Sequence, residues 1–190
     1  DAARRYRALF EAGRLRAGKD GELDGCFQMA GPKVRLEQLA PALAPIPELA
    51  EVLDPAAAAE RLGVTPAEGG LWLPHSGWLH PAAACRALLA GNGIALETHC
   101  GEVSLARENG GWEARAADGR RWAAEIAVVA AGTASARLAD LDWLPLRPIR
   151  GQVSALPAAT VPGTLRVPFC HGGYVTPAKS GTLNFGASFA

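Results

Sequence analysis

The feature that most constrains the fold is an unbroken apolar run past the middle of the chain. It covers residues 126–131, with the sequence IAVVAA, and ends at Gly132. A short run of this kind, bounded by glycine, is typical of a strand buried on both faces of a mostly parallel sheet. Such a strand cannot stand alone, so the run predicts part of a Rossmann-like sheet.

The glycine loop that normally opens such a sheet does not occur in the sequence. The nearest match is Gly91-Asn92-Gly93, but Leu96 stands where the third glycine of G-x-G-x-x-G belongs, and the segment follows a helical pattern instead of a strand. We therefore interpret the chain as an interior piece of a larger flavin or nicotinamide enzyme.

Composition is that of a globular protein. The 190 residues are 49% hydrophobic and suffice for a core. No apolar run approaches the roughly 20 residues that span a membrane, and the N-terminus does not resemble a signal peptide. We expect a cytoplasmic protein without membrane contact.

The four cysteines are far apart and form no C-x-x-C motif, so we expect reduced cysteines and no zinc site. His75 and His80 have no third ligand nearby in sequence, and we expect no metal.

Charge is unevenly distributed although the net charge is zero. Residues 144–190 contain no Asp or Glu but carry four cations, Arg147, Arg150, Arg166 and Lys179, whereas residues 38–143 carry 13 acidic and 7 basic side chains. Two interpretations stay open. This stretch faces an anion, or its arginines pair with carboxylates such as Asp140 and Asp142.

The order of expected elements indicates an α+β fold: an antiparallel sheet with helices, plus part of the Rossmann-like sheet. Helices are expected over 2–17, in short pieces over 33–53, from Pro55 to Gly63 after an Asp54 cap, and over 81–90. Strands are expected over 25–29, 71–74, 94–97, 102–107, 112–117, 121–132, 151–156, 165–170, 173–176 and 183–188. We divide the chain into a helical segment of the substrate domain (1–70), a partial cofactor domain (71–143) and antiparallel substrate-domain strands (144–190).

Four parts of the sequence together resemble one flavoprotein family: GLWLPHSGWLHP (70–81), AVVAAG (127–132), PLRPIRGQVS (145–154), and FCHGGYVTP (169–177) with NFGASF (184–189). They are similar to the D-amino-acid-oxidase superfamily, and most closely to the FAD-dependent half of the bifunctional tRNA 5-methylaminomethyl-2-thiouridine biosynthesis proteins. The resemblance implies an FAD enzyme that oxidises the secondary amine of 5-carboxymethylaminomethyl-2-thiouridine at the tRNA wobble position and releases glyoxylate. It further implies tRNA as a partner, and a methyltransferase domain and FAD-loop segments in the same polypeptide.

The resemblance also suggests site residues. We expect Arg150, Gln152 and Tyr174 to be catalytic, with Arg150 or Arg147 pairing with the substrate carboxylate. Substrate contacts are expected at Arg147, Ser76, Gly77 and Trp78, and cofactor contacts at Glu102, Val103, Ala130, Ala131, Gly132 and Gly151. Trp78 and Tyr174 have a simpler alternative, which is packing in the core or in a strand. Because the chain lacks a glycine loop at a helix N-terminus, we expect it to bind FAD weakly or not at all by itself.

Two other functions stay open at this point. One is a small-molecule amine or amino-acid oxidase similar to glycine or sarcosine oxidase. The other is a catalytically silent module that binds tRNA or a partner domain. The basic, acid-free stretch after Leu144 favours an RNA partner over a small zwitterion because cationic side chains attract phosphates.

Overall fold

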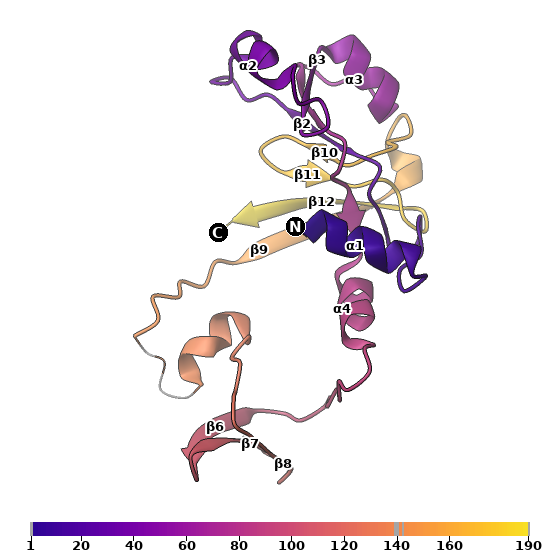
Figure 1. Ribbon diagram of the computed structural model, residues 1–190. Helices are drawn as coiled ribbons and strands as arrows, with labels where there is room; N and C mark the ends of the chain where they lie inside the picture. Colours follow the sequence, from indigo (N-terminus) through magenta and orange to yellow (C-terminus); the bar gives the residue numbers. More distant parts are fainter. Residues whose placement is uncertain (1, 139–140, 142, 190) are drawn as a thin grey trace. The chain divides into compact units, whose positions relative to one another are not determined.

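The computed structural model of the protein describes residues 2–138, 141 and 143–189 (Figure 1). Contacts divide the chain into two units. One unit combines the residues up to 92 with those from 150 onward, and the other covers residues 93–149. The functional division at residues 70 and 143 stays a prediction.

The first unit is built on a mixed sheet whose strands come from both of its chain segments. Its seven strands follow the order β3-β4-β2-β10-β11-β12-β9, and all neighbours are antiparallel except β2 and β10, which are parallel. In that order the strands are Glu51–Leu53, Gly70–Leu73, Cys26–Met29, Phe169–Cys170, Tyr174–Val175, Thr182–Phe189 and Gly151–Pro157. A second sheet pairs β1 (Gly21–Glu22) with β5 (Trp78–Leu79).

Four α-helices accompany these sheets, namely α1 (Ala2–Glu11), α2 (Leu36–Leu43), α3 (Pro55–Leu62) and α4 (Pro81–Leu89), with a short 3₁₀ helix η2 (Ala158–Thr160). α2 and α3 lie beside β3 at one edge of the large sheet (Figure 1). The expected α+β class is thereby confirmed.

The helix α3 shows how local sequence signals build this unit. Asp54 accepts a hydrogen bond from the backbone N–H of Ala57 at 2.8 Å, Pro55 takes the first helical position, and Gly63 ends the helix with a φ of 78°. These features confirm the predicted cap. The helix buries Ala58 and Leu62 in the main core, which also contains Phe27, Leu53, Trp72 and Val167.

A smaller core joins α1 to α4 through Leu9, Leu15, Ala83 and Ala87. α1 is shorter than the helix expected over 2–17. It ends at Glu11 because the chain turns at Gly13, where φ is 68°.

The second unit contains a three-stranded antiparallel meander of β6 (Val103–Glu108), β7 (Gly111–Ala116) and β8 (Arg121–Ala124). Asn109 and Gly110 connect the first two strands with φ values of 50° and 82°, as a tight hairpin turn requires. The predicted hairpin is confirmed.

The predicted buried parallel strand is wrong for this structure. Residues 125–131 form no strand, and Ile126 and Val128 are 79% and 86% exposed. Residues 94–97, a second expected strand, are also irregular, and Ile94 and Leu96 lie half exposed. The cause is the absence of a partner among the described residues, since an isolated apolar strand has nothing to pair its backbone or cover its side chains.

Two further strands are shorter than expected. The strand predicted over 165–170 forms only at Phe169–Cys170, because Pro168 offers no backbone N–H to a ladder, and the strand over 173–176 forms only at Tyr174–Val175.

Candidate functional site

Two of the expected catalytic residues lie together at the edge of the large sheet. Arg150 immediately precedes β9, the last strand in the sheet order, and its Nη2 donates a hydrogen bond to Gln152 Oε1 at 2.9 Å. Both side chains are exposed. Gly151 pairs with Phe189 of β12, so backbone pairing holds the start of β9. The arrangement aligns one guanidinium N–H and leaves the rest of the planar donor set available to a carboxylate.

Tyr174 lies in the same sheet but not beside that pair. On β11 it pairs with Gly186 of β12, and directly paired residues share one face of a sheet. On β9, Gln152 and Ser154 lie on the same face of the sheet because side chains alternate along a strand. Ser154 pairs with Phe185 of β12, so Phe185 also lies on that face. Gly186, the next residue of β12, lies on the opposite face. The register thus places Tyr174 and Gln152 on opposite faces, with β12 between their strands.

The turn before β5 is closely packed. The Ser76 carbonyl accepts a hydrogen bond from the Gly25 N–H at 3.0 Å, and a Cβ on Gly77 would lie 1.9 Å from the carbonyl oxygen of Glu22. Glycine at 77 is therefore required for the approach of β1 to β5.

Trp78 follows in β5 and is half-buried. Its Nε1 is buried without a hydrogen-bond partner among the described residues, and the Lys179 ammonium lies 5.1 Å from the ring centroid. The structure thus gives Trp78 a packing role and a cation contact. Its expected substrate contact stays a prediction.

The expected cofactor residues of the second unit lie on the meander and on the turn after it. Glu102 O accepts a hydrogen bond from Ala117 N at 3.1 Å, and Val103 begins β6. Ala131 N donates to Ser135 Oγ at 3.0 Å, and Gly132 begins the 3₁₀ helix η1 (Gly132–Arg137) with a φ of 58°.

The contacts of these residues with a flavin dinucleotide stay a prediction. A Cβ on Gly132 would meet no atom within 4 Å, and Ala130 and Ala131 are small, so a flat group can come close to the backbone there. No site for the pyrophosphate is found at α2, α3 or α4, because these helices are preceded by Arg35, Asp54 and His80 and not by a glycine loop. The small residues around Gly132 are compatible with a nearby cofactor ring, whereas the described residues show no group of backbone N–H donors for its phosphates.

The cations of the acid-free stretch have no acidic partner among the described residues. None of Arg147, Arg150, Arg166 and Lys179 takes part in an ion pair there, whereas Arg16, Arg61, Arg115, Arg120 and Arg121 do. Arg166 instead donates to the Glu60 carbonyl at 3.1 Å, and Lys179 donates to the Gly18 carbonyl. The proposed partners Asp140 and Asp142 lie outside the described residues. The interpretation that this stretch faces an external anion therefore stays a prediction.

Two cysteines that are 144 residues apart in sequence come together in the large sheet. Cys26 of β2 and Cys170 of β10 have their Sγ atoms 3.6 Å apart. The hydrogen bond from Cys26 lowers the pKa of the Cys170 thiol to about 7, and the pKa of Cys26 is raised by the same hydrogen bond and by burial. Sequence spacing carried no signal for this pair.

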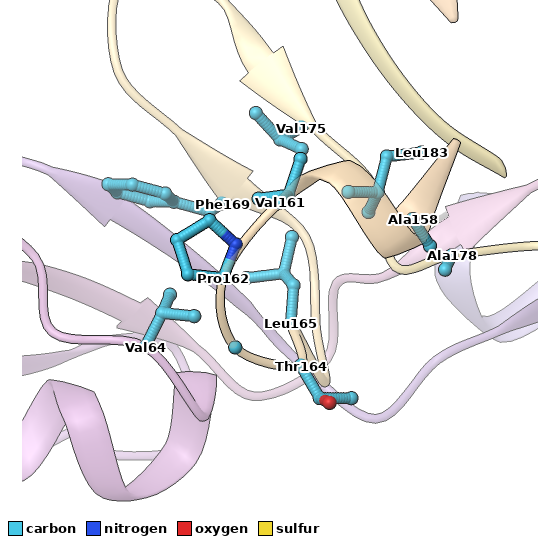
Figure 2. Close-up of a pocket in the computed structure, with 11 residues that line it drawn as sticks. Val64, Ala158, Val161, Pro162, Thr164, Leu165, Phe169, Val175, Ala178 and Leu183 are labelled. Carbon is cyan, nitrogen blue, oxygen red and sulfur yellow. The ribbon is translucent and has the colours of Figure 1, made fainter. Parts of the chain in front are cut away.

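An apolar cavity of about 350 Å³ opens between the end of α3, the loop after η2 and the strands β10–β12. Figure 2 shows Val64, Pro162, Leu165, Phe169 and Leu183 among the side chains that line it. This cavity was not expected from the sequence.

Neither a membrane span nor a metal centre is found in the part of the chain that the structure describes. No helix there is long and apolar enough to cross a bilayer. No group of three or more His, Cys, Asp or Glu side chains there is placed to hold a metal ion.

Known relatives are similar to the chain over most of its length. It is 40% identical over 178 residues to the tRNA 5-methylaminomethyl-2-thiouridine biosynthesis bifunctional protein MnmC of Stutzerimonas stutzeri. The aligned region covers 93% of this chain and 27% of that protein. The protein of the same name from Pseudomonas aeruginosa is 37% identical over 177 residues, again 93% of the chain and 27% of the relative. The chain thus spans about a quarter of the length of these relatives.

Solved structures show the same fold at low sequence identity. Glycine oxidase from Bacillus cereus has a TM-score of 0.65 and 22% identity over 98% of this chain and 57% of its own. The amino acid oxidase NikD has a TM-score of 0.62 and 19% identity over 97% of this chain and 53% of its own.

The family model of the FAD dependent oxidoreductases (DAO) matches residues 1–190, the full length of the chain. This match agrees with the mixed sheet, with the small residues before η1 and with the fold of the solved oxidases. The chain belongs to the family of FAD dependent oxidoreductases.

Proposed function

We propose that the protein to which this chain belongs oxidises 5-carboxymethylaminomethyl-2-thiouridine at the wobble position of tRNA and removes its carboxymethyl group as glyoxylate. Family membership and the relatives named MnmC support an FAD-dependent oxidoreductase for the activity and tRNA for the substrate. The observation that carries the proposal is Arg150, an exposed guanidinium aligned by Gln152 in a stretch without acidic residues.

Each expected residue has a task in this reaction. FAD, when bound, supplies the two-electron acceptor for oxidation of the C–N bond. Arg150 pairs through two parallel N–H···O bonds with the substrate carboxylate and so orients the adjacent carbon. Gln152 accepts a hydrogen bond from one guanidinium N–H of Arg150 and so fixes the plane of the guanidinium group. Gly132 and its small neighbours admit the cofactor to the backbone.

The negative charge of a tRNA substrate agrees with the positive charge of the stretch after Leu144. A tRNA presents many phosphates besides the carboxylate, and Arg147 and Lys179 carry charge that no described carboxylate neutralises. Phosphate contacts make binding strongly dependent on salt. Activity on tRNA implies a cytoplasmic enzyme, and the word bifunctional in the relatives' names suggests that the same polypeptide carries the methyltransferase.

The test is glyoxylate release from tRNA that carries the modified nucleoside, by the full-length protein with Arg150→Lys as the main variant. Lysine keeps the charge but loses the bidentate geometry, so we expect kcat/KM to fall roughly 10- to 100-fold, which corresponds to about 1.4–2.7 kcal/mol. Arg86→Lys makes the same substitution at an exposed position of α4 as the matched control and should leave kcat/KM unchanged.

Three results would contradict the proposal. If the Arg150→Lys variant had the same kcat/KM as the unchanged protein, Arg150 would not bind the substrate carboxylate. Turnover of glycine or sarcosine in place of tRNA would indicate a small-molecule oxidase. A full-length protein that shows no flavin absorbance would indicate a silent binding module.

A further inference from the structure

The sheet of the first unit holds the sulfurs of Cys26 and Cys170 within reach of each other. β2 and β10 are neighbouring parallel strands in which Phe169 pairs with Phe27 and Cys170 with Gln28. Cys26 and Cys170 have their Sγ atoms 3.6 Å apart. A disulfide bond is about 2.05 Å long, so the sulfurs need to move together by roughly 1.5 Å.

The two thiols differ in access to solvent. Cys26 is 7% exposed, whereas Cys170 is only half-buried. A reagent from solvent therefore meets Cys170 first. The Cys170 backbone is also tied to β2, since Gln28 Nε2 donates to its carbonyl at 3.3 Å.

We propose that Cys26 and Cys170 form a reversible redox-active dithiol, in which Cys170 is the thiol oxidised by peroxides and Cys26 is the resolving thiol that closes a disulfide between β2 and β10. This inference concerns a modification site and does not depend on the proposed tRNA activity.

The chemistry balances in two steps. The Cys170 thiolate attacks the hydroxyl oxygen of a peroxide ROOH, so an S–O bond forms as the O–O bond breaks. RO⁻ leaves as ROH after taking a proton from water, and Cys170 becomes a sulfenic acid. The Cys26 sulfur then attacks the Cys170 sulfur, the S–O bond breaks, and the departing hydroxide takes the Cys26 proton and leaves as water. The two thiols lose two electrons, and the peroxide gains them.

The hydrogen bond between the thiols favours this division of roles. At pH 7 a thiol with a pKa of about 7 is about half thiolate, against about 3% for an ordinary cysteine. This roughly 15-fold gain is offset by a roughly 5-fold lower intrinsic nucleophilicity of the less basic sulfur, which leaves about a 3-fold faster attack.

The experiment compares two substitutions at position 26 in the full chain. Cys26→Ser keeps a hydrogen-bond donor to Cys170 but cannot form a disulfide, whereas Cys26→Ala loses both. After limited hydrogen peroxide treatment, we expect proteolysis of the unchanged protein to yield a Cys26–Cys170 linked peptide that dithiothreitol separates. In Cys26→Ser we expect a sulfenic acid at Cys170 that dimedone traps.

Alkylation by iodoacetamide at pH 7 measures the thiolate directly. We expect Cys26→Ala to slow alkylation of Cys170 about 3-fold and Cys26→Ser to leave it near the original rate. Cys85→Ser is the matched control, because Cys85 is exposed and should not affect the linked peptide. Circular dichroism establishes that each variant is folded.

The proposal is overturned if peroxide produces no linked peptide while Cys170 proceeds to sulfinic acid, because the strands then hold the sulfurs apart. It is equally overturned if dimedone labels Cys85 or Cys100 but not Cys170 in Cys26→Ser.

Discussion

Replacement of Gly77 by alanine tests whether the turn before β5 is determined by close backbone packing. The added Cβ would lie 1.9 Å from Glu22 O and 2.8 Å from both Glu22 C and Leu23 Cα. All three are backbone atoms, so no side chain can rotate away and β1 has to move from β5. Overpacking costs typically about 1–3 kcal/mol, and we expect Gly77→Ala to lie at the upper end, about 3 kcal/mol.

Thermal unfolding followed by circular dichroism measures this cost. For a chain of this size, about 3 kcal/mol lowers Tm by on the order of 6–12 °C. Gly31→Ala is the matched control because a Cβ at Gly31 meets no atom within 4 Å, and we expect a change in Tm near zero or slightly upward. If the Gly77→Ala and Gly31→Ala variants had the same Tm, the close approach of β1 and β5 would be refuted.

The remaining predictions concern a helix cap, a core position and an ion pair. Asp54→Ala should lower the free energy of unfolding by about 1 kcal/mol in urea titration, because the Ala57 N–H loses its acceptor, and an unchanged midpoint would contradict the cap. Leu62→Ala removes a fully buried side chain and should cost about 2–5 kcal/mol, whereas a loss under about 1 kcal/mol would show that the core closes over the gap. The hydrogen bond from Arg16 holds the pKa of Asp20 below its ordinary value, so the stabilisation is complete above about pH 4 and is lost as pH falls through the lower folded-state pKa. Urea unfolding at several pH values should therefore show Asp20→Asn less stable than the unchanged protein at pH 7 and the difference shrinking in acid, and a pH-independent difference would contradict this reasoning.

Local signals predicted the elements whose stability is local. The Asp54-Pro55 start and the Gly63 stop of α3, and the Asn109-Gly110 turn, depend on neighbouring backbone groups, so a few residues suffice to specify them. The apolar run at 126–131 shows the opposite case. Its pattern describes a strand that has partners, and in this structure it is exposed and irregular.

The candidate site divides in the same way. The segment RPIRGQVS placed Arg150 and Gln152 close together because only Gly151 lies between them in the sequence, and the structure joins them by a hydrogen bond. The face of Tyr174 could not be read from its own strand, since the bulge between Phe185 and Ser188 and the order β11-β12-β9 decide it.

Family, fold class, caps and turns were thus determined by the sequence alone, because motifs and local hydrogen bonds act over a few residues. The tertiary structure alone decided the meeting of Cys26 with Cys170, the cavity beside Phe169 and the lack of an acidic partner for Arg150 among the described residues. These features depend on strand order and register, and strand order brings together residues whose separation along the chain carries no signal.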